Sequence, residues 1–249
     1  MDRGERVDLA KEISNTFIQR HGGSIVATGI RGSVARQEDV EQSNLNVVVV
    51  TTSPEIAVSR ALLYGPIAVE LYVVDQRAYL EDAHIIGPWW PVRADQFSHH
   101  IALHDPNEFW KSLRKAFEEK MESPSDDEFL RAETANIVQA VSWAYKARAA
   151  SGSSDEMARL AIAEAALRAV LAMGLRARFV FKNAAHAFRF APQLPGAPEG
   201  FGPAMQKALA GGLEVPEAIG AMEDAVEALL EGAMSNNVPV VAEAPADFL

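Results

Sequence analysis

The stretch that decides the fold is residues 30–51, IRGSVARQEDVEQSNLNVVVVT. A turn signal, Gly32-Ser33, lies near its start, and a polar loop leads to a run of four valines at 47–50. Because β-branched residues bounded by polar ones are typical of a buried strand, Leu45 to Thr51 is predicted to be a strand. The turn and the loop therefore separate two predicted strands, the first of which runs from Ser24 to Ile30.

The other apolar patterns of the first half predict two more strands and two helices. Ile67 to Asp75 (IAVELYVVD) is apolar on both sides of one acidic residue, Glu70, and is typical of a strand. Ser98 to Leu103 is a further candidate strand. A helix is predicted from Arg6 to Arg20, where apolar residues recur at helical spacing before a glycine pair. Another is predicted from Pro54 to Tyr64, with proline near its first turn.

Helical patterns dominate the second half. Capping boxes, in which a polar side chain precedes an acidic residue by three positions, mark the starts of three helices. They are Asp105-Pro106-Asn107-Glu108 before a helix to about Lys120, Ser125 with Glu128 before a helix to about Ala149, and Ser153 with Glu156 before a helix that Gly174 ends. Residues 184–203 carry four prolines and three glycines and predict a long loop, whereas residues 217–234 predict a last helix.

Strands come first and helices follow, which predicts the α+β class. We expect a mixed sheet with flanking helices, followed by a C-terminal helical bundle. The predicted boundaries are residues 1–122 for the sheet domain, 123–234 for the helical domain and 235–249 for a flexible tail.

Composition excludes several classes of protein. The 249 residues include 34 acidic and 23 basic side chains, a net charge of −11, and no cysteine. Disulfides, thiolate metal sites and cysteine nucleophiles are therefore excluded, and the acidic excess argues against nucleic acid as a partner. No apolar run approaches the roughly 20 residues of a membrane helix, and the first residues lack the apolar core of a signal peptide. We therefore expect a cytoplasmic protein that does not bind a membrane.

Three oxygen-bearing side chains of the first half belong together if the predicted strands are neighbours. Asn44 and Asn46 are two positions apart, so they project from one face of their strand while Leu45 enters the core. Glu70, inside a later strand, could meet them. Such a set beside a glycine turn with open N–H groups is a common way to hold magnesium and a nucleoside triphosphate.

These residues carry a resemblance to a known family. The runs Gly32-Ser33-Val34-Ala35-Arg36-Gln37, Ser43-Asn44-Leu45-Asn46 and Val69-Glu70-Leu71 resemble the signature of the polymerase-β-like nucleotidyltransferase superfamily. More narrowly, they resemble the kanamycin (aminoglycoside) nucleotidyltransferases. The similarity continues through Gly87-Pro88-Trp89-Trp90-Pro91, Gln96-Phe97-Ser98 and His104-Asp105, and covers roughly residues 6–234.

The resemblance implies a nucleotidyltransferase-fold domain and a helical domain in a subunit that works as a homodimer. It implies transfer of a nucleotidyl group, with Mg²⁺, from ATP or another nucleoside triphosphate to a hydroxyl of an aminoglycoside. The implied nucleotide-binding residues are Gly32, Ser33, Arg36 and Lys146; the implied metal ligands are Asn44, Asn46 and Glu70; and the position of the catalytic base maps to Trp143.

The chain departs from this family at its metal ligands. Asn44 and Asn46 stand where the family has carboxylates, so Glu70 alone is left to offset the charge of the metal ions. Phosphoryl transfer depends on positioning and charge neutralisation, so losing two carboxylates is expected to cost several powers of ten in rate. Trp143 cannot accept a proton. The asparagines could be an engineered exchange or natural divergence, and Trp143 favours divergence, because an engineered metal knockout needs no change at the base.

Two functions are therefore expected. The first is a nucleotidyltransferase-family protein, a possible pseudoenzyme, whose catalysis is weak or absent. The second is a non-catalytic dimeric protein that binds a nucleotide or another small ligand, or has a regulatory role, through the old site or through Trp89-Trp90. The two hypotheses differ in whether ATP binding depends on magnesium.

Overall fold

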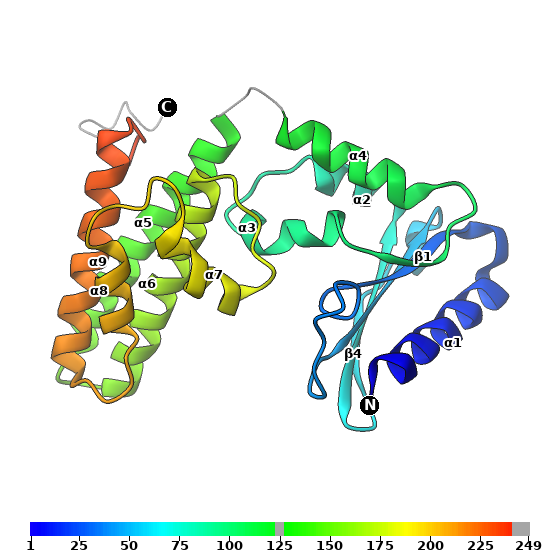
Figure 1. Cartoon of the computed structure of the whole chain (residues 1–249), viewed down its shortest axis with the longest axis horizontal. Coiled ribbons are helices and arrows are strands. Elements are labelled where there is room, and N and C mark those ends of the chain that lie inside the picture. The colour runs from blue at the N-terminus through cyan, green and yellow to red at the C-terminus, as the bar shows by residue number, and fades with distance from the viewer. Residues whose placement is uncertain (123–126, 241–249) are drawn as a thin grey trace. The chain divides into compact units, whose positions relative to one another are not determined.

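The computed structural model describes residues 1–122 and 127–240, and these residues form two compact units (Figure 1). The first unit is Met1–Ile85 with Ala94–Pro124, and the second is Ile86–Arg93 with Ser125–Leu249. The chain therefore enters the second unit at residue 86 and returns to the first at residue 94. A single boundary at residue 122, as predicted, leaves residues 86–93 in the first domain, whereas the structure groups them with the second unit.

The first unit is built on a mixed sheet. Its described strands are β1 (Ile25–Arg31), β2 (Leu45–Thr51), β3 (Arg60–Tyr64), β4 (Ile67–Asp75) and β5 (Ile101–His104), in the spatial order β3-β4-β2-β1-β5. β2 and β4 run parallel, and the other neighbouring strands run antiparallel. The predicted α+β class, with a mixed sheet in the first half, is confirmed.

Different helices cover the two faces of the sheet. Helix α1 (Arg3–His21) lies along one face (Figure 1), where Leu9 and Ala10 pack against Leu45, Val47 and neighbouring apolar residues. On the other face, Tyr79 of α2 (Gln76–Ala83) makes ring contacts with Tyr72 of β4, with Phe97 and with Phe109 of α4 (Phe109–Met121). Because side chains alternate along a strand, Asn46 and Glu70 lie on this second face.

The prediction of a helix from Pro54 to Tyr64 is wrong. Pro54–Ile56 forms one short 3-10 turn, and Arg60–Tyr64 forms the edge strand β3. β3 pairs with β4 around a tight turn in which Gly65 has φ +58°, so that Tyr64 stands opposite Ile67. Pairing with the adjacent strand overrides the helical propensity of a leucine-containing segment.

The second unit is helical. Its longest helices, α5 (Asp127–Ala150), α6 (Asp155–Arg176) and α9 (Val215–Ser235), pack side by side (Figure 1). Their shared core is rich in alanine, including Ala140, Ala144, Ala165 and Ala169, and small side chains let helices approach closely. The predicted helical bundle is confirmed.

The predicted long loop at residues 184–203 is wrong. It contains α7 (Ala184–Phe190) and a 3-10 turn at Ala191–Gln193, and α8 (Phe201–Ala208) begins within it. Asn183 caps α7 by accepting a 2.8 Å hydrogen bond from the N–H of His186. The prolines and glycines of this segment stand mostly between short helices, and for that reason their frequency imitates a loop.

The helix starts differ in detail from the predicted capping boxes. The Asp105 carboxylate accepts hydrogen bonds from the N–H groups of Phe109 and Trp110, at 2.6 and 3.2 Å, so α4 begins after Glu108 and not at Pro106. Ser154, and not Ser153, caps α6. Ser125 lies outside the described residues.

Gly174 does not end its helix, because α6 continues to Arg176. A Cβ at this position would lie 2.5 Å from the ring of Phe181 and 2.8 Å from Pro91. The glycine therefore allows close packing inside the second unit.

The segment Ile86–Arg93, which includes α3 (Trp90–Arg93), is held in the second unit by side-chain and backbone contacts. Trp90 is buried and packs edge-on against Phe129 at 5.1 Å between ring centroids. The carbonyl of Pro91 accepts a 2.6 Å hydrogen bond from the N–H of Phe181, and that of Pro88 accepts one of 2.7 Å from Asn136. Partners so distant in sequence explain why the excursion was not predicted.

The predicted flexible tail is described only as far as residue 240. Val238, three residues after the end of α9, is buried against the core of the second unit. Residues 241–249 lie outside the described residues. Across the described part of the chain, no helix is long and apolar enough to cross a membrane.

Candidate functional site

The Gly32-Ser33 turn follows β1 directly. The N–H of Arg36 donates to the carbonyl of Gly32 at 3.1 Å, and that of Glu38 donates to the carbonyl of Ser33 at 2.9 Å. Gly32 has φ +76°, and a Cβ there would lie 2.9 Å from the side-chain nitrogen of Asn46. Only glycine accommodates both the backbone conformation and this close approach. The turn is therefore packed directly against the predicted site.

Asn44, Asn46 and Glu70 lie together, next to the turn. Asn46 stands opposite Glu70 in the parallel β2–β4 pair. The side-chain nitrogen of Asn44 donates a 2.9 Å hydrogen bond to a carboxylate oxygen of Glu70, and that of Asn46 lies 3.5 Å from the side-chain oxygen of Asn44. An ionised carboxylate can only accept, so the amide nitrogen must face Glu70. Glu70 itself is exposed, although apolar residues stand on both sides of it in β4.

Arg36 is already engaged by carboxylates. Its guanidinium pairs with Asp95 and, at 3.1 Å, with Glu38, and the side chain is 8% exposed. Asp95 belongs to the 3-10 helix Ala94–Phe97 and also lies 3.2 Å from a ring nitrogen of His99. The ion pair between Arg36 and Asp95 thus links the turn to this helix. Contact of Arg36 with a nucleotide stays a prediction.

Arg31, immediately before the turn, was not singled out by the sequence. It stands opposite Asn46 in the antiparallel β1–β2 pair, so both side chains lie on the same face. The centre of its guanidinium is 4.8 Å from the centroid of the Tyr72 ring, and the guanidinium donates a hydrogen bond to the side-chain oxygen of Gln96. Its position beside the Gly-Ser turn was the signal that could have identified it.

Two ionisable side chains near Arg31 are uncharged at neutral pH. Burial, supported by the positive charge of Arg31, lowers the pKa of His100 to about 3. Burial also raises the pKa of Tyr79 above its usual value. The His100 ring stacks on that of Trp110, with 4.3 Å between centroids. These two groups therefore contribute no negative charge to the surroundings of Arg31.

A buried arginine holds the loop that leads to Asn44. Arg6 of α1 is 1% exposed and pairs with Asp39 at 3.0 Å. It also donates hydrogen bonds to the carbonyls of Val40 and Glu41, at 2.9 and 2.7 Å. Helix α1 therefore both covers one face of the sheet and holds the loop that precedes β2.

This chain is similar to known proteins in structure and, over part of its length, in sequence. A solved structure of a nucleotidyltransferase-like protein from Exiguobacterium sibiricum is similar with a TM-score of 0.57 and 12% identity, covering 90% of this chain and 75% of that one. Two curated relatives, aminoglycoside nucleotidyltransferases (4') from Staphylococcus aureus and a Bacillus species, are each 27% identical over 105 residues. This match spans 42% of the chain and 42% of either relative. No family model matches the chain.

The chain has the nucleotidyltransferase fold. The predicted resemblance to that superfamily is confirmed at the level of fold, with distant sequence similarity to aminoglycoside nucleotidyltransferases. The Gly-Ser turn and the asparagine pair lie next to each other within this fold.

The magnesium pair that the nucleotidyltransferase resemblance implies does not fit the residues present. The donors are one carboxylate and two amides, and an N–H of Asn44 is directed at the carboxylate of Glu70. Within the described ranges, no three His, Cys, Asp or Glu side chains converge as a metal site. Hard cations are held mainly by the negative charge of their oxygen ligands, so an amide-rich set with one carboxylate is a weak site.

Two residues assigned to the nucleotidyltransferase mechanism by resemblance lie in the second unit, on α5. The ammonium group of Lys146 lies 3.8 Å from the centroid of the Trp143 ring, as a cation–π pair. Trp143 is half-buried and has no group that can accept a proton at neutral pH. The base position therefore stays without a base under this assignment, and the role of Lys146 stays a prediction.

The two tryptophans of residues 89–90 have different environments. Trp90 is buried in the core of the second unit, whereas Trp89 is 39% exposed, with the guanidinium of Arg168 4.6 Å from its ring centroid. Trp89 is thus the member of the pair that a ligand could reach.

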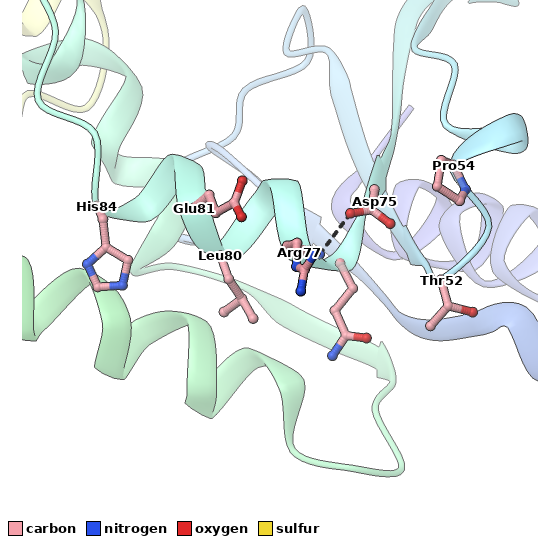
Figure 2. A pocket seen from close by; sticks show the side chains of 8 residues that line it. Thr52, Pro54, Asp75, Arg77, Leu80, Glu81 and His84 are labelled. Carbon is pink, nitrogen blue, oxygen red and sulfur yellow. Dashed lines mark hydrogen bonds between the residues drawn. The ribbon is translucent and has the colours of Figure 1, made fainter.

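A separate cavity of about 670 Å³ lies at the carboxyl ends of β2 and β4 (Figure 2). Thr52, Asp75, Arg77, Glu81 and His84 are among the residues that line it. Asp75 caps α2 by accepting hydrogen bonds from the N–H groups of Arg77 and Ala78. Five residues of extended strand, about 16 Å, separate Asp75 from Glu70, so this cavity is distinct from the candidate site.

Proposed function

We propose that this chain is a nucleotide-binding protein of the nucleotidyltransferase fold whose nucleotidyl transfer is weak or absent. One observation carries the proposal, the hydrogen bond that Asn44 donates to Glu70. A carboxylate at position 44 would instead repel Glu70, and the two would need a cation between them. The Gly32-Ser33 turn, packed against Asn46, supports retention of a phosphate-binding element.

The expected loss of transfer follows from charge. Phosphoryl transfer needs compensation of the negative charge that is spread over the transferring group, and the protein holds the compensating ions with carboxylates. Here Glu70 is the single carboxylate of the three positions. We therefore expect a transfer rate several powers of ten below that of an enzyme with a complete set.

The nucleotide and the acceptor are proposed from the relatives. Two of them are named aminoglycoside nucleotidyltransferases, which supports ATP or another nucleoside triphosphate as ligand and an aminoglycoside as acceptor of any residual transfer. A cytoplasmic location likewise belongs to the proposal.

Self-association as a homodimer is also part of the proposal, and the edge strand β3 supports it. All five residues of β3 are exposed, with Leu62 at 67%, Leu63 at 82% and Tyr64 at 54%. An exposed apolar edge strand offers unpaired backbone groups to a second strand, and two copies of β3 can pair antiparallel about a two-fold axis. A groove of about 390 Å³ between β3 and α1 would admit side chains of the second copy.

A non-catalytic binding or regulatory role for this dimer is the second candidate. The observation that favours it is the exposed ring of Trp89 beside Arg168, because a tryptophan–arginine pair is a common platform for a planar ligand. Substituting Trp89 by alanine would weaken binding if the ligand uses this platform, and would leave it unchanged if the ligand uses the Gly32-Ser33 turn.

The test compares the native chain with the double variant Asn44→Asp/Asn46→Asp. Titration calorimetry with ATP, with and without Mg²⁺, should show magnesium-enhanced binding in the double variant only. An adenylylation assay with kanamycin should show gain of transfer in that variant, at a rate still limited by the lack of a base at Trp143. A control variant, Asn236→Asp/Asn237→Asp, adds the same charge beyond α9 and should change neither measurement. Absence of ATP binding in every variant contradicts the proposal.

A further inference from the structure

Arg31 is a cation for which the described residues supply no counter-charge. Its guanidinium contacts the ring of Tyr72 and the amide of Gln96, and its charge acts on the neighbouring Tyr79 and His100. Among the residues that the structure describes, no carboxylate forms an ion pair with it. Glu70, the acidic residue of the site, instead accepts a hydrogen bond from Asn44.

Two well-buried arginines of the first unit show the contrast. Arg6, 1% exposed, pairs with Asp39, and Arg36, 8% exposed, pairs with Asp95 and Glu38. A partly buried charge without a partner is costly, and a surface that keeps one usually uses it to bind a ligand of opposite charge. The half-buried guanidinium of Arg31 also retains donors beyond its hydrogen bonds to Gln96 and Tyr79, because it carries five N–H groups.

The adjacent turn offers further donors to the same ligand. The N–H groups of Arg36, Gln37 and Glu38 are used inside the turn. Those of Ser33 and Ala35 meet no acceptor in the part of the chain that the structure describes, whereas Val34 is fully buried. The free N–H groups of Ser33 and Ala35 can donate to an anion. These two amides and the guanidinium come from one short segment, residues 31–35.

We propose that Arg31 and the amides of Ser33 and Ala35 bind a phosphate group directly, so that this site takes a phosphorylated ligand without a metal ion. The proposal rests on the nucleotide binding proposed above and specifies its chemistry. A guanidinium matches the geometry of phosphate oxygens with two parallel hydrogen bonds.

The asparagines complete this arrangement. Two carboxylates at positions 44 and 46 would compete with phosphate for Arg31, which stands opposite Asn46, and would repel the anion. With amides at these positions only the carboxylate of Glu70 is left to repel the anion, and each amide nitrogen carries a second N–H besides the one directed at Glu70 or at Asn44. Arg31 and the Asn44–Asn46 pair thus both favour an anion over a cation at this site.

The experiment is titration calorimetry in EDTA, with inorganic tripolyphosphate, ATP and adenosine as probes. The native chain should bind tripolyphosphate and ATP, and Arg31→Gln should weaken both by about tenfold or more, because a charged hydrogen-bond donor is lost. Arg31→Lys should give intermediate affinities, since it keeps the charge and loses the planar fork. Arg77→Gln removes the same charge from the cavity of Figure 2 and should leave the affinities unchanged.

Each other result has a definite meaning. Unchanged affinity in Arg31→Gln, or ATP binding that requires Mg²⁺, overturns metal-free phosphate binding and leaves nucleotide binding standing. If adenosine binds as tightly as ATP and tripolyphosphate does not bind, metal-free phosphate binding is likewise overturned and nucleotide binding stands. Failure of the native chain to bind ATP with or without Mg²⁺ overturns both proposals. Thermal unfolding of each variant shows that it is folded, and the native chain in EDTA is a test that needs no variant.

Discussion

Asn44 donates a 2.9 Å hydrogen bond to Glu70 across the parallel strands β2 and β4. This contact joins two of the three positions at which the nucleotidyltransferase resemblance places metal ligands. It satisfies the carboxylate with a neutral donor from the protein itself. Glu70 therefore has a hydrogen-bond partner without a cation. Arg31, on the same face of the sheet, has no carboxylate partner among the described residues.

Replacing Gly32 by alanine is expected to destabilise the first unit by about 1–2 kcal/mol, because an L-residue at φ +76° is strained. The new Cβ would also displace the Asn46 side chain, which lies within 2.9 Å. Urea unfolding measures the loss of stability. Gly23→Ala is the matched control, since a Cβ there has nothing within 4 Å. Equal stabilities of the two variants would contradict the strained turn.

Replacing Arg6 by alanine is expected to lower the free energy of unfolding by about 3 kcal/mol, because it breaks a buried ion pair and two hydrogen bonds to the loop before Asn44. Arg3 is the other partner of Asp39, and the side chain of Arg3 is 42% exposed. Arg3→Ala should therefore cost less than about 1 kcal/mol. Denaturant unfolding distinguishes them, and similar losses in both variants would show that the loop does not depend on Arg6.

His100 predicts a pH dependence of stability. Burial lowers its pKa to about 3, whereas an unfolded histidine titrates near 6.5. Between these values the unfolded chain binds a proton that the folded chain excludes. The contribution is therefore complete above about pH 6.5 and is lost as the pH falls, at up to about 1.4 kcal/mol per pH unit.

His100→Asn removes this part of the pH dependence. The difference in free energy of unfolding between the native chain and the variant should narrow as the pH is lowered from about 7 to about 5.5, before most carboxylates titrate. His84→Asn, at an exposed histidine of the same unit, is the control. A constant difference across this range would mean that the imidazole of His100 is accessible to protons.

Leu63→Lys is expected to shift the chain from dimer to monomer, because it places a charge on the most exposed apolar side chain of the edge strand β3. Light scattering after size-exclusion chromatography measures the mass. Leu160→Lys changes an exposed leucine of the second unit and should leave the mass unchanged. A monomeric native chain, or a dimer that persists in Leu63→Lys, would rule out pairing through β3.

Much of the sheet could be predicted from local sequence. The valine run of β2 and the apolar run of β4 indicated both strands at the bounds that the structure shows, since β-branched runs have few alternatives. The juxtaposition of Asn44, Asn46 and Glu70 followed from side-chain alternation once these strands were neighbours. β3 was missed because its pairing depends on the turn at Gly65 and on β4, and not on its own pattern.

The parts of the site that escaped prediction depend on residues far apart in sequence. That no described carboxylate pairs with Arg31 becomes visible only once the fold places Tyr72, Gln96 and His100 near it. Likewise, Arg36 matched a family motif, but its pairing with Asp95 depends on the return of the chain after residue 93. Motifs identified the residue types, and only the fold showed which charges are compensated.

The magnesium dependence of ATP binding to the native chain is the most direct measurement. Metal-free phosphate binding predicts that the dissociation constant of ATP in EDTA and that in excess Mg²⁺ agree within about twofold. A dissociation constant that is about tenfold or more lower with Mg²⁺ would show that Asn44, Asn46 and Glu70 still hold a metal ion, in contradiction to the site described above.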